Sequence, residues 1–272
     1  MKHTGNAALK IRLESIQKSF NIDGHAEPVL AGVDLTVQQG EFVSIIGPSG
    51  CGKSTLLNIL AGLEPTDAGL VEVAGVPEGA RLGRIGYMQQ KDLLLPWRTV
   101  LDNTTLGLEL QGVPRREARE RALRLFDDFG LRGFEQQFPF ALSGGMRQRA
   151  AFLRTVLMDQ EVLLLDEPFG ALDALTRVQM QEWLLALWSN LHQTIVLITH
   201  DVDEAILLSD RVYVLTARPA RVKLVLDVAL PRPRDFRSVT QPDFVALKSR
   251  LLLTLHEESA RQVGGWSAEV GR

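Results

Sequence analysis

The sequence predicts an α/β fold that is interrupted by a helical insertion, and three observations support this prediction. Two β-branched or aliphatic runs of the kind found in buried parallel strands, at residues 162–165 and 194–198, are separated by a helical pattern, and an apolar run of strand length lies at 41–46. Alternating apolar and polar residues at 10–15 and 33–37 indicate half-buried strands near the N-terminus. Between about residues 114 and 131 the pattern becomes helical and highly charged. Strands therefore lie on both sides of a helical block.

The remaining elements follow from periodicity and turn signals. A turn-rich stretch at residues 21–28 separates the first two strands. Helices are expected from Lys53 onward and over residues 143–158, 175–191 and 242–262. Further strands are expected at residues 69–74, 84–88, 212–215 and 222–228, with a turn at 75–79. Residues 231–234, Pro-Arg-Pro-Arg, are expected to break the chain's regular structure, and the residues after Gly264 are expected to fray.

The composition is that of a globular protein of a reducing compartment. The 272 residues are 45% hydrophobic and 23% charged, which excludes a disordered or fibrous chain. A net charge of −3 argues against a dedicated nucleic-acid binder. No apolar run approaches the roughly 20 residues of a membrane span, and no signal peptide is expected. The single cysteine, Cys51, excludes an internal disulfide.

Residues 47–54, which we call the phosphate loop, match G-x-x-x-x-G-K-[ST] without a mismatch between an expected strand and an expected helix. Glycines let backbone N–H groups surround a phosphate, and the helix N-terminus adds a positive dipole. Lys53 is expected to neutralise phosphate charge, and the Ser54 hydroxyl is expected to bind Mg²⁺. The expected nucleotide contacts are Gly47, Pro48, Ser49, Gly50, Cys51, Gly52, Lys53, Ser54 and Thr55. Cys51 is interpreted as a small loop residue, although the helix dipole could lower its pKa.

A second acidic motif narrows the chemistry. The aliphatic run 162–165 ends in Asp166 and Glu167. Burial of this strand would fix the carboxylate of Asp166 near Mg²⁺, and Glu167 would then face the γ-phosphate as a general base for the attacking water. The alternative is a strand that merely ends in an acidic turn. The two motifs therefore predict a site for a nucleotide phosphate and Mg²⁺, as found in kinases, GTPases and many ATPases.

Residues 142–148, Leu-Ser-Gly-Gly-Met-Arg-Gln, form a signature segment that resembles the LSGG-x-x-Q motif of the ATP-binding-cassette (ABC) ATPases. Ser143 suits a helix N-cap, Gly144 and Gly145 allow close backbone approach, and the helix start forms an anion site. A second anion site beside a single phosphate loop makes most sense if it serves the nucleotide of another subunit. The resemblance implies a P-loop NTPase core with an inserted α-helical subdomain and an N-terminal antiparallel β region.

Other positions match the same family. Gln90 resembles the glutamine of the Q-loop, and its spacing to the following Leu-Leu-Pro-Trp favours it over Gln89. Asp173 resembles the D-loop aspartate, and His200 resembles the switch histidine. Phe20 is the candidate for stacking on adenine, with a role in the core as the alternative.

The resemblance assigns roles residue by residue. It implies catalytic roles for Glu167, His200, Gln90 and Lys53, and Mg²⁺ contacts for Ser54, Gln90 and Asp166. Nucleotide contacts are implied for Phe20, the phosphate loop with Thr55, Ser143, Gly144, Gly145 and Asp173.

The resemblance covers residues 9–230, with the helical subdomain at about 91–160, and it leaves 231–272 as a short, partly flexible helical extension. Residues 94–100 and 167–173 are similar to bacterial importer ATPases for nitrate, sulfonates, taurine, bicarbonate and thiamine-precursor pyrimidines. The resemblance thus implies the ATP-hydrolysing subunit of an importer, peripheral on the cytoplasmic face of the inner membrane.

Several partners are implied by this resemblance. They are a second copy in a head-to-tail homodimer that sandwiches ATP, integral-membrane permease subunits and, indirectly, an extracytoplasmic solute-binding protein, with no nucleic acid. Residues 93–97, which we call the apolar loop, would either receive a permease helix or pack inside the helical subdomain. The alternative functions are a soluble cassette ATPase acting on nucleic acid or ribosomes, and a P-loop kinase, which would leave the signature segment and His200 unexplained.

Two charged stretches are also open to interpretation. Residues 115–121 are interpreted as a solvated helix face with i,i+4 ion pairs. The basic stretch 218–237 is interpreted as a solvated surface, with contact to lipid head groups as the alternative.

Overall fold

Two units make up the computed structural model, which describes residues 8–76, 81–191 and 193–269. Unit 1 combines the chain before Gly83 with the chain after Leu191, and unit 2 is the stretch between them. Within the described ranges, no helix has both the length and the apolar character needed to cross a membrane.

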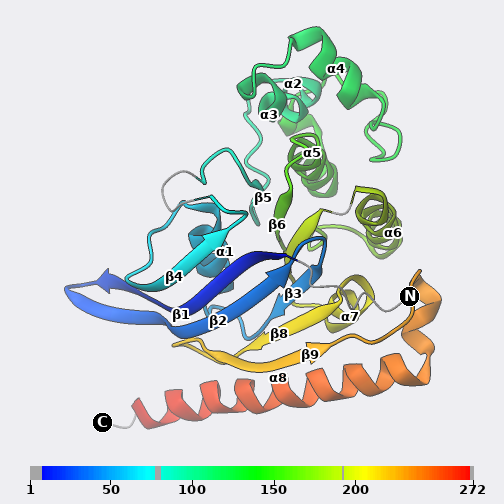
Figure 1. Ribbon diagram of the computed structural model, residues 1–272. Coiled ribbons are helices and arrows are strands. Elements are labelled where there is room, and N and C mark those ends of the chain that lie inside the picture. Colours follow the sequence, from blue (N-terminus) through cyan, green and yellow to red (C-terminus); the bar gives the residue numbers. More distant parts are fainter. Residues whose placement is uncertain (1–7, 77–80, 192, 270–272) are drawn as a thin grey trace. The chain divides into compact units, whose positions relative to one another are not determined.

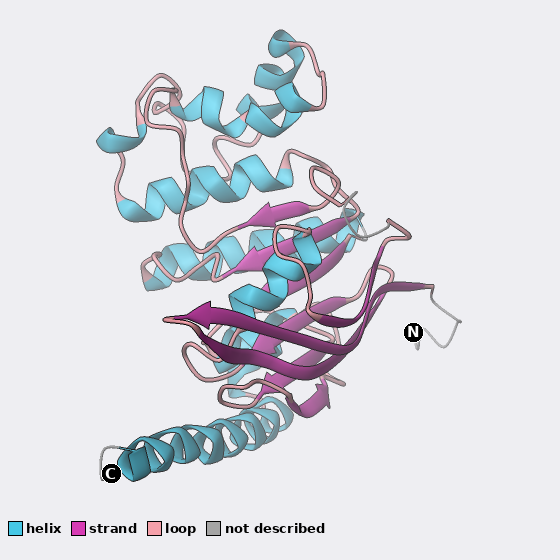
Figure 2. Ribbon diagram, turned by 90° about the vertical axis from the view of Figure 1, so that its left-hand side faces the viewer, coloured by secondary structure: helices cyan, strands magenta, loops and turns pink. Residues whose placement is uncertain are grey.

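Unit 1 contains a three-stranded antiparallel sheet in the order β2-β1-β4. Its strands are β1 (Leu9–Ile22), β2 (His25–Gln38) and β4 (Ala68–Val73). The expected antiparallel β region is confirmed, and a turn does lie within residues 21–28. It is shorter than the sequence indicated, since it comprises only Asp23 and Gly24, both with positive φ, as type I′ hairpins require. Register shifts along the long β1–β2 hairpin accompany the curvature visible in Figure 2.

Unit 1 also contains strands of a mixed sheet, in the order β7-β3-β8-β9. They are β3 (Phe42–Ile46), β7 (Thr194–Ile198), β8 (Arg211–Leu215) and β9 (Val222–Asp227). β3 is parallel to both β7 and β8, whereas β9 is antiparallel to β8. Every residue of β3 and β7 is buried, which explains their largely apolar sequences. The helices α1 (Lys53–Ala61) and α7 (Val202–Leu208) follow β3 and β7.

The C-terminal extension forms a short 3₁₀ helix, η2 (Phe236–Thr240), and the long helix α8 (Pro242–Glu269). α8 packs on α7 and β8 (Figure 1). Its residues Phe244 and Leu251 are fully buried. The helix continues past Gly264 to Glu269, and the expected fraying there stays a prediction.

The arginines of the Pro-Arg-Pro-Arg segment are turned toward the protein, Arg234 buried and Arg232 half-buried, which neither interpretation of the basic stretch anticipated. Arg234 is 5% exposed and donates to the carbonyl oxygens of Ile206, Ser209, Val228 and Leu230 at 2.6–3.0 Å. Arg232 donates to Leu208 O and to the carboxylate of Asp210, both at 2.8 Å. Burial lowers the pKa of Arg234 to about 10, which still leaves it charged at pH 7. The two guanidinium groups therefore hold the extension to the C-terminal end of α7.

Unit 2 joins two parallel strands, β5 (Gly86–Met88) and β6 (Val162–Asp166), to a set of helices. The helices are α2 (Val100–Thr104), α3 (Leu106–Leu110), α4 (Arg115–Leu123), η1 (Pro139–Ala141), α5 (Gly144–Val156) and α6 (Ala174–Leu191). Edge-to-face contacts join the rings of Phe129, Phe152, Phe169 and Trp183, with centroids 4.4–5.9 Å apart. Unit 2 thus has an aromatic core of its own.

The charged helix α4 carries the i,i+4 pairs that the sequence predicts, between Arg116 and Glu120 and between Arg121 and Glu117. Its other face is tied to α2, because Arg115 and Arg119 both pair with Asp102, at 3.1 and 2.7 Å. Burial disfavours the charged form of Asp102, but hydrogen bonds from the two arginines keep its pKa below the usual value.

Candidate nucleotide-binding site

The phosphate loop in unit 1 begins where β3 leaves the sheet, and two of its glycines, Gly47 and Gly52, stand where side chains would collide. A Cβ on Gly47 would lie 3.1 Å from Leu215 O. A Cβ on Gly52 would lie 2.8 Å from Val29 Cγ1, and Gly52 has φ +117°. The loop is therefore packed against β2 and β8 on one side. Ser49, Gly50 and Ser54 are exposed, Thr55 is half-buried and Pro48 is buried.

The ammonium group of Lys53 is held inside the phosphate loop. Lys53 Nζ donates to Gly47 O and to Pro48 O, both at 2.9 Å. A lysine ammonium has three N–H donors, so these bonds leave one donor for a further acceptor. This geometry would allow the Lys53 ammonium to donate its third hydrogen bond to a bound phosphate group.

Cys51 is buried beneath the loop. Burial raises the pKa of its thiol, and the nearby positive charges of Lys53 and Arg218 offset this only in part. The suggestion that the helix dipole could lower this pKa was therefore wrong, because desolvation of the thiolate dominates. The role of a small loop residue remains.

His200 lies at the same sheet edge as the phosphate loop. β3 and β7 are adjacent and parallel, so Gly47 and His200 follow the carboxyl ends of neighbouring strands. His200 is exposed. The next residue, Asp201, caps α7 by accepting from the N–H groups of Asp203 and Glu204 at 2.8 and 3.2 Å. This cap fixes the backbone immediately after the histidine.

Phe20 is half-buried near the end of β1. The ammonium of Lys18 lies 5.2 Å from the centroid of its ring, within cation–π range. The ring is thus neither fully exposed nor part of the fully buried core, and stacking on adenine remains a prediction.

The two carboxylates that follow β6 in unit 2 have different environments. Asp166 is buried, whereas Glu167 is half-buried. The amide nitrogen of Gln90 lies 3.4 Å from Glu167 Oε2, a long hydrogen bond by ordinary criteria. Unit 2 therefore brings Gln90 and Glu167 together. Gln89, the other candidate for the Q-loop glutamine, is half-buried, whereas Gln90 is exposed.

Glu167 has φ +50°, a left-handed conformation that is uncommon for residues other than glycine. Two groups hold its carbonyl oxygen: Gly170 N at 3.2 Å and Gln148 Nε2 at 3.4 Å. Strained backbone of this kind clusters at functional sites, where the surrounding structure maintains it. The conformation turns the Glu167 side chain out of the line of β6.

Ser143 caps α5, since its Oγ accepts from Met146 N at 3.2 Å. Ser143 and Gly144 are exposed at this helix N-terminus, which carries positive partial charge. A Cβ on Gly145 would lie 3.4 Å from Ala171 O, so the start of the signature segment adjoins the segment that leads to Asp173. Hydrogen bonds from Thr176 lower the pKa of the exposed Asp173.

The residues expected to bind Mg²⁺ offer the ligand types that this ion prefers. Ser54 presents an exposed hydroxyl on the first turn of α1, Asp166 a carboxylate at the end of β6, and Gln90 an exposed amide. Mg²⁺ takes oxygen ligands, often one or two from the protein together with phosphate and water. The donor set therefore fits Mg²⁺. The described residues hold no cluster of three His, Cys, Asp or Glu side chains suited to a metal ion.

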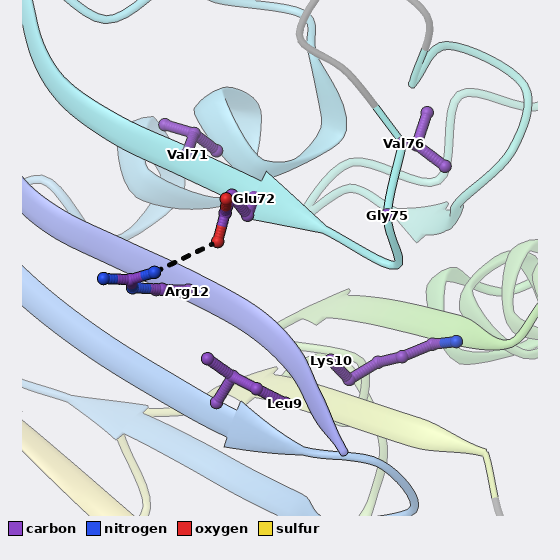
Figure 3. Close-up of a pocket in the computed structure, with 7 residues that line it drawn as sticks. All are labelled: Leu9, Lys10, Arg12, Val71, Glu72, Gly75 and Val76. Carbon is purple, nitrogen blue, oxygen red and sulfur yellow. Dashed lines mark ion pairs between the residues drawn. The ribbon is translucent and has the colours of Figure 1, made fainter.

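A separate hollow of about 580 Å³ lies on the antiparallel sheet of unit 1. Figure 3 shows its lining residues, among them Arg12, which points toward Glu72 across a distance of 3.6 Å. This hollow contains none of the residues that the motifs single out.

Two site residues were missed by the sequence analysis. Gln148 ends the signature segment and reaches the Glu167 carbonyl; the motif itself could have indicated it. Arg218 donates to Gly50 O at 2.8 Å, and it lies 168 positions away in the sequence, where no local signal marks it.

Comparisons with known proteins agree with this geometry. The model of the family described as ABC transporter matches residues 30–170. The chain is 52% identical over 206 residues to an aliphatic sulfonates import ATP-binding protein of Rhodococcus jostii, covering 76% of this chain and 80% of that protein. It is 42% identical over 238 residues to a formylaminopyrimidine import ATP-binding protein of Halalkalibacterium halodurans, covering 87% and 93%.

A solved structure is similar over most of the chain. It is a dimeric ATP-binding cassette in a post-hydrolysis state, bound to ADP and inorganic phosphate. Its TM-score is 0.74 at 30% identity, and the match covers 81% of this chain and 100% of that one. With the phosphate loop, the signature segment and the acidic end of β6 in place, the chain belongs to the ABC transporter family as an ATPase subunit, which hydrolyses ATP to drive transport.

Proposed function

We propose that the chain is the ATPase subunit of an importer for a small organic solute of the sulfonate or pyrimidine type. The observation that carries this proposal is the identity of 42–52%, over most of the chain, to two proteins named for the import of such solutes. The proposal includes permease subunits that form the path across the membrane and a solute-binding protein on its outer side.

In the proposed mechanism, the N–H groups of the phosphate loop and the ammonium of Lys53 bind the phosphates of ATP. Mg²⁺, held by Ser54, Asp166 and Gln90, would neutralise phosphate charge when bound. Glu167 accepts a proton from the attacking water, and Gln90 orients the Glu167 carboxylate through the contact described above. His200 donates a hydrogen bond toward the γ-phosphate. Each of these roles is inferred from the family resemblance and supported by the local geometry.

The exposed start of the signature segment supports a role for a second copy. Ser143 and Gly144 present the N-terminus of a 13-residue helix to solvent. We propose that this helix end contacts the γ-phosphate of ATP held by the partner copy in a head-to-tail dimer. Closure would then depend on ATP, and hydrolysis would weaken it, which provides the bias for a mechanical cycle.

The apolar loop and its surroundings support a permease-docking surface in unit 2. Trp97 is 73% exposed and Leu93 is exposed, whereas Leu94 is only 8% exposed. Phe138 and Phe140 are also exposed, and their rings stack in parallel with centroids 5.8 Å apart. Backbone hydrogen bonds from Val100 N to Gln137 O and from Leu101 N to Glu135 O join the segment after Trp97 to the segment before these rings. An exposed group of large aromatic residues is typical of a protein interface.

Three experiments test these proposals. Lys53→Ala is expected to abolish ATP hydrolysis by the purified chain, and undiminished activity would remove the phosphate-loop assignment. Ser143→Arg should block dimer closure while leaving ATP binding to the monomer nearly intact. Recovery of activity on mixing the two variants would indicate a composite site, and failure of every mixture to recover activity would count against contacts between copies.

The importer role is tested by growth. A strain that lacks this chain is expected to lose growth on one sulfonate or pyrimidine source, and the wild-type chain should restore it while Lys53→Ala should not. Normal growth of the deletion strain on every such source would contradict the proposed solute class.

A further inference from the structure

The turn between β8 and β9 connects the phosphate loop to the C-terminal helix α8. On one side of this turn, Arg218 donates to Gly50 O at 2.8 Å. On the other side, Ala217 N donates to Glu258 Oε2 at 3.3 Å. Adjacent residues of one turn therefore contact a loop near residue 50 and a helix near residue 258, and all of them lie in unit 1.

The contact with Gly50 acts on the peptide group that the phosphate loop uses. The Gly50 carbonyl and the Cys51 N–H belong to one planar peptide unit, so they point in opposite directions. With Arg218 holding the oxygen outside, the Cys51 N–H is directed into the loop, where it lies 3.3 Å from Pro48 O. Gly50 has φ +73°, and no neighbouring atom would meet a Cβ there. The peptide is thus held from its nitrogen side by the hydrogen bond from Cys51 N to Pro48 O and from its oxygen side by Arg218.

Glu258 is suited to hold the turn because its own position is well determined. Its side chain is 2% exposed, and Lys223 of β9 lies 3.4 Å from its Oε1. Burying a carboxylate is costly unless it is paired and hydrogen-bonded. The helix that carries it is fixed independently, through the buried Phe244 and Leu251 and through an ion pair of 2.7 Å between Lys248 and Asp203 of α7.

We propose that Arg218 is a positioning residue for the nucleotide phosphates, and that Glu258 of the C-terminal helix holds the Arg218 turn so that the extension sets ATP affinity. The proposal rests on ATP binding by the phosphate loop. It gives the extension a function within the nucleotide site, beyond simple packing.

The first test compares two variants of the full-length purified chain that remove the same charge from one turn. Arg218→Gln is expected to weaken Mg-ATP binding about three- to tenfold, the effect of losing one hydrogen bond of ordinary net strength. Arg221→Gln is the matched control, since the Arg221 guanidinium lies beside Gly32 instead of the phosphate loop. Binding is measured by isothermal titration calorimetry, and KM and kcat are measured in a turnover assay.

A positioning role predicts a specific pattern. For Arg218→Gln the KM for ATP should rise while kcat at saturating ATP and the Tm stay close to wild type, and Arg218→Lys should recover part of the loss. In the absence of nucleotide, amide hydrogen exchange in the peptide that covers residues 47–56 should be faster in Arg218→Gln than in the wild-type chain. Equal ATP affinity for Arg218→Gln and Arg221→Gln would overturn the proposal.

The second test asks whether Glu258 acts through Arg218. Glu258→Gln should weaken ATP binding in the same direction, and the double variant should bind no more weakly than Arg218→Gln alone. Fully additive losses would show that the extension does not act through this turn. If Glu258→Gln lowers the Tm by more than a few degrees, Lys223→Gln takes its place, because it removes only the ion pair. A wild-type chain that binds no ATP would contradict the nucleotide site itself, an outcome distinct from each of these.

Discussion

Replacing Trp97 by alanine distinguishes the two possible roles of the apolar loop, a docking surface for the permease and a part of the packed core. At 73% exposure, roughly a quarter of the Trp97 surface is covered by the chain. A fully enclosed Trp buries about 200 Å², so the covered part is about 50 Å² and contributes about 1.3 kcal/mol to folding at about 25 cal/mol per Å². A buried Trp would instead cost about 3–5 kcal/mol on truncation.

The matched control is Leu94→Ala in the same loop. Leu94 is 8% exposed, and truncation of a buried leucine costs about 2–5 kcal/mol. Trp97→Ala should therefore lower the Tm of the isolated subunit by about 5 °C or less, and Leu94→Ala should lower it by more. In the complex the order reverses: loss of an aromatic contact at an interface centre weakens association by about thirtyfold or more.

The assay pairs thermal unfolding of the isolated subunit with co-purification of the permease from membranes that express the whole transporter. For Trp97→Ala we expect a folded ATPase that no longer co-purifies and no longer supports solute uptake. If Trp97→Ala retains the permease and transport, and instead unfolds as early as Leu94→Ala, the loop belongs to the core and the docking proposal is wrong.

Three further predictions concern single residues. Glu167→Gln should lower turnover by about 10²–10⁴-fold while making the ATP-bound dimer easier to isolate by size-exclusion chromatography; turnover equal to wild type would exclude Glu167 as the base. Cys51 should react with iodoacetamide at pH 8 at least about tenfold more slowly than free cysteine, because burial raises its pKa and covers the sulfur; alkylation at the free rate would contradict this. Arg234→Met should cost about 3 kcal/mol or more in the free energy of unfolding, since it leaves buried carbonyl oxygens unpaired, whereas Arg237→Met at an exposed position should be nearly neutral in the same urea titration.

The parts of the site that the sequence predicted are those in which the chemistry is contiguous. The phosphate loop consists of eight consecutive residues between a strand and a helix, and its glycines indicate the tight backbone conformation that the loop adopts. The Ser143 cap is likewise local, since its oxygen bonds to an N–H three residues later. The buried strands β3 and β7 were found because a strand that is covered on both faces is apolar at nearly every position.

The parts that could not be predicted depend on contacts between distant segments. Arg234 was expected on the surface because its neighbours are Pro and Arg, but it pairs with carbonyl oxygens of α7 and of the β9–η2 segment. Arg218 reaches Gly50 across 168 positions. The short helices α2 and α3 were not expected either, because five residues are too few to show a helical period.

The apolar loop shows why its role could not be decided from composition. Its five residues would suit either a core or an interface, and the conformation of the loop depends on Asn103, a buried residue of α2. Its amide nitrogen donates to the carbonyl oxygens of Leu95, Arg98 and Thr99, and its oxygen accepts from Leu95 N at 2.7 Å. These bonds fix the backbone on both sides of Trp97, and the ring remains outside. A loop that is already ordered loses less conformational entropy when a partner binds. The hydrogen bonds of Asn103 would therefore lower the entropic cost of the proposed docking of a permease on Trp97.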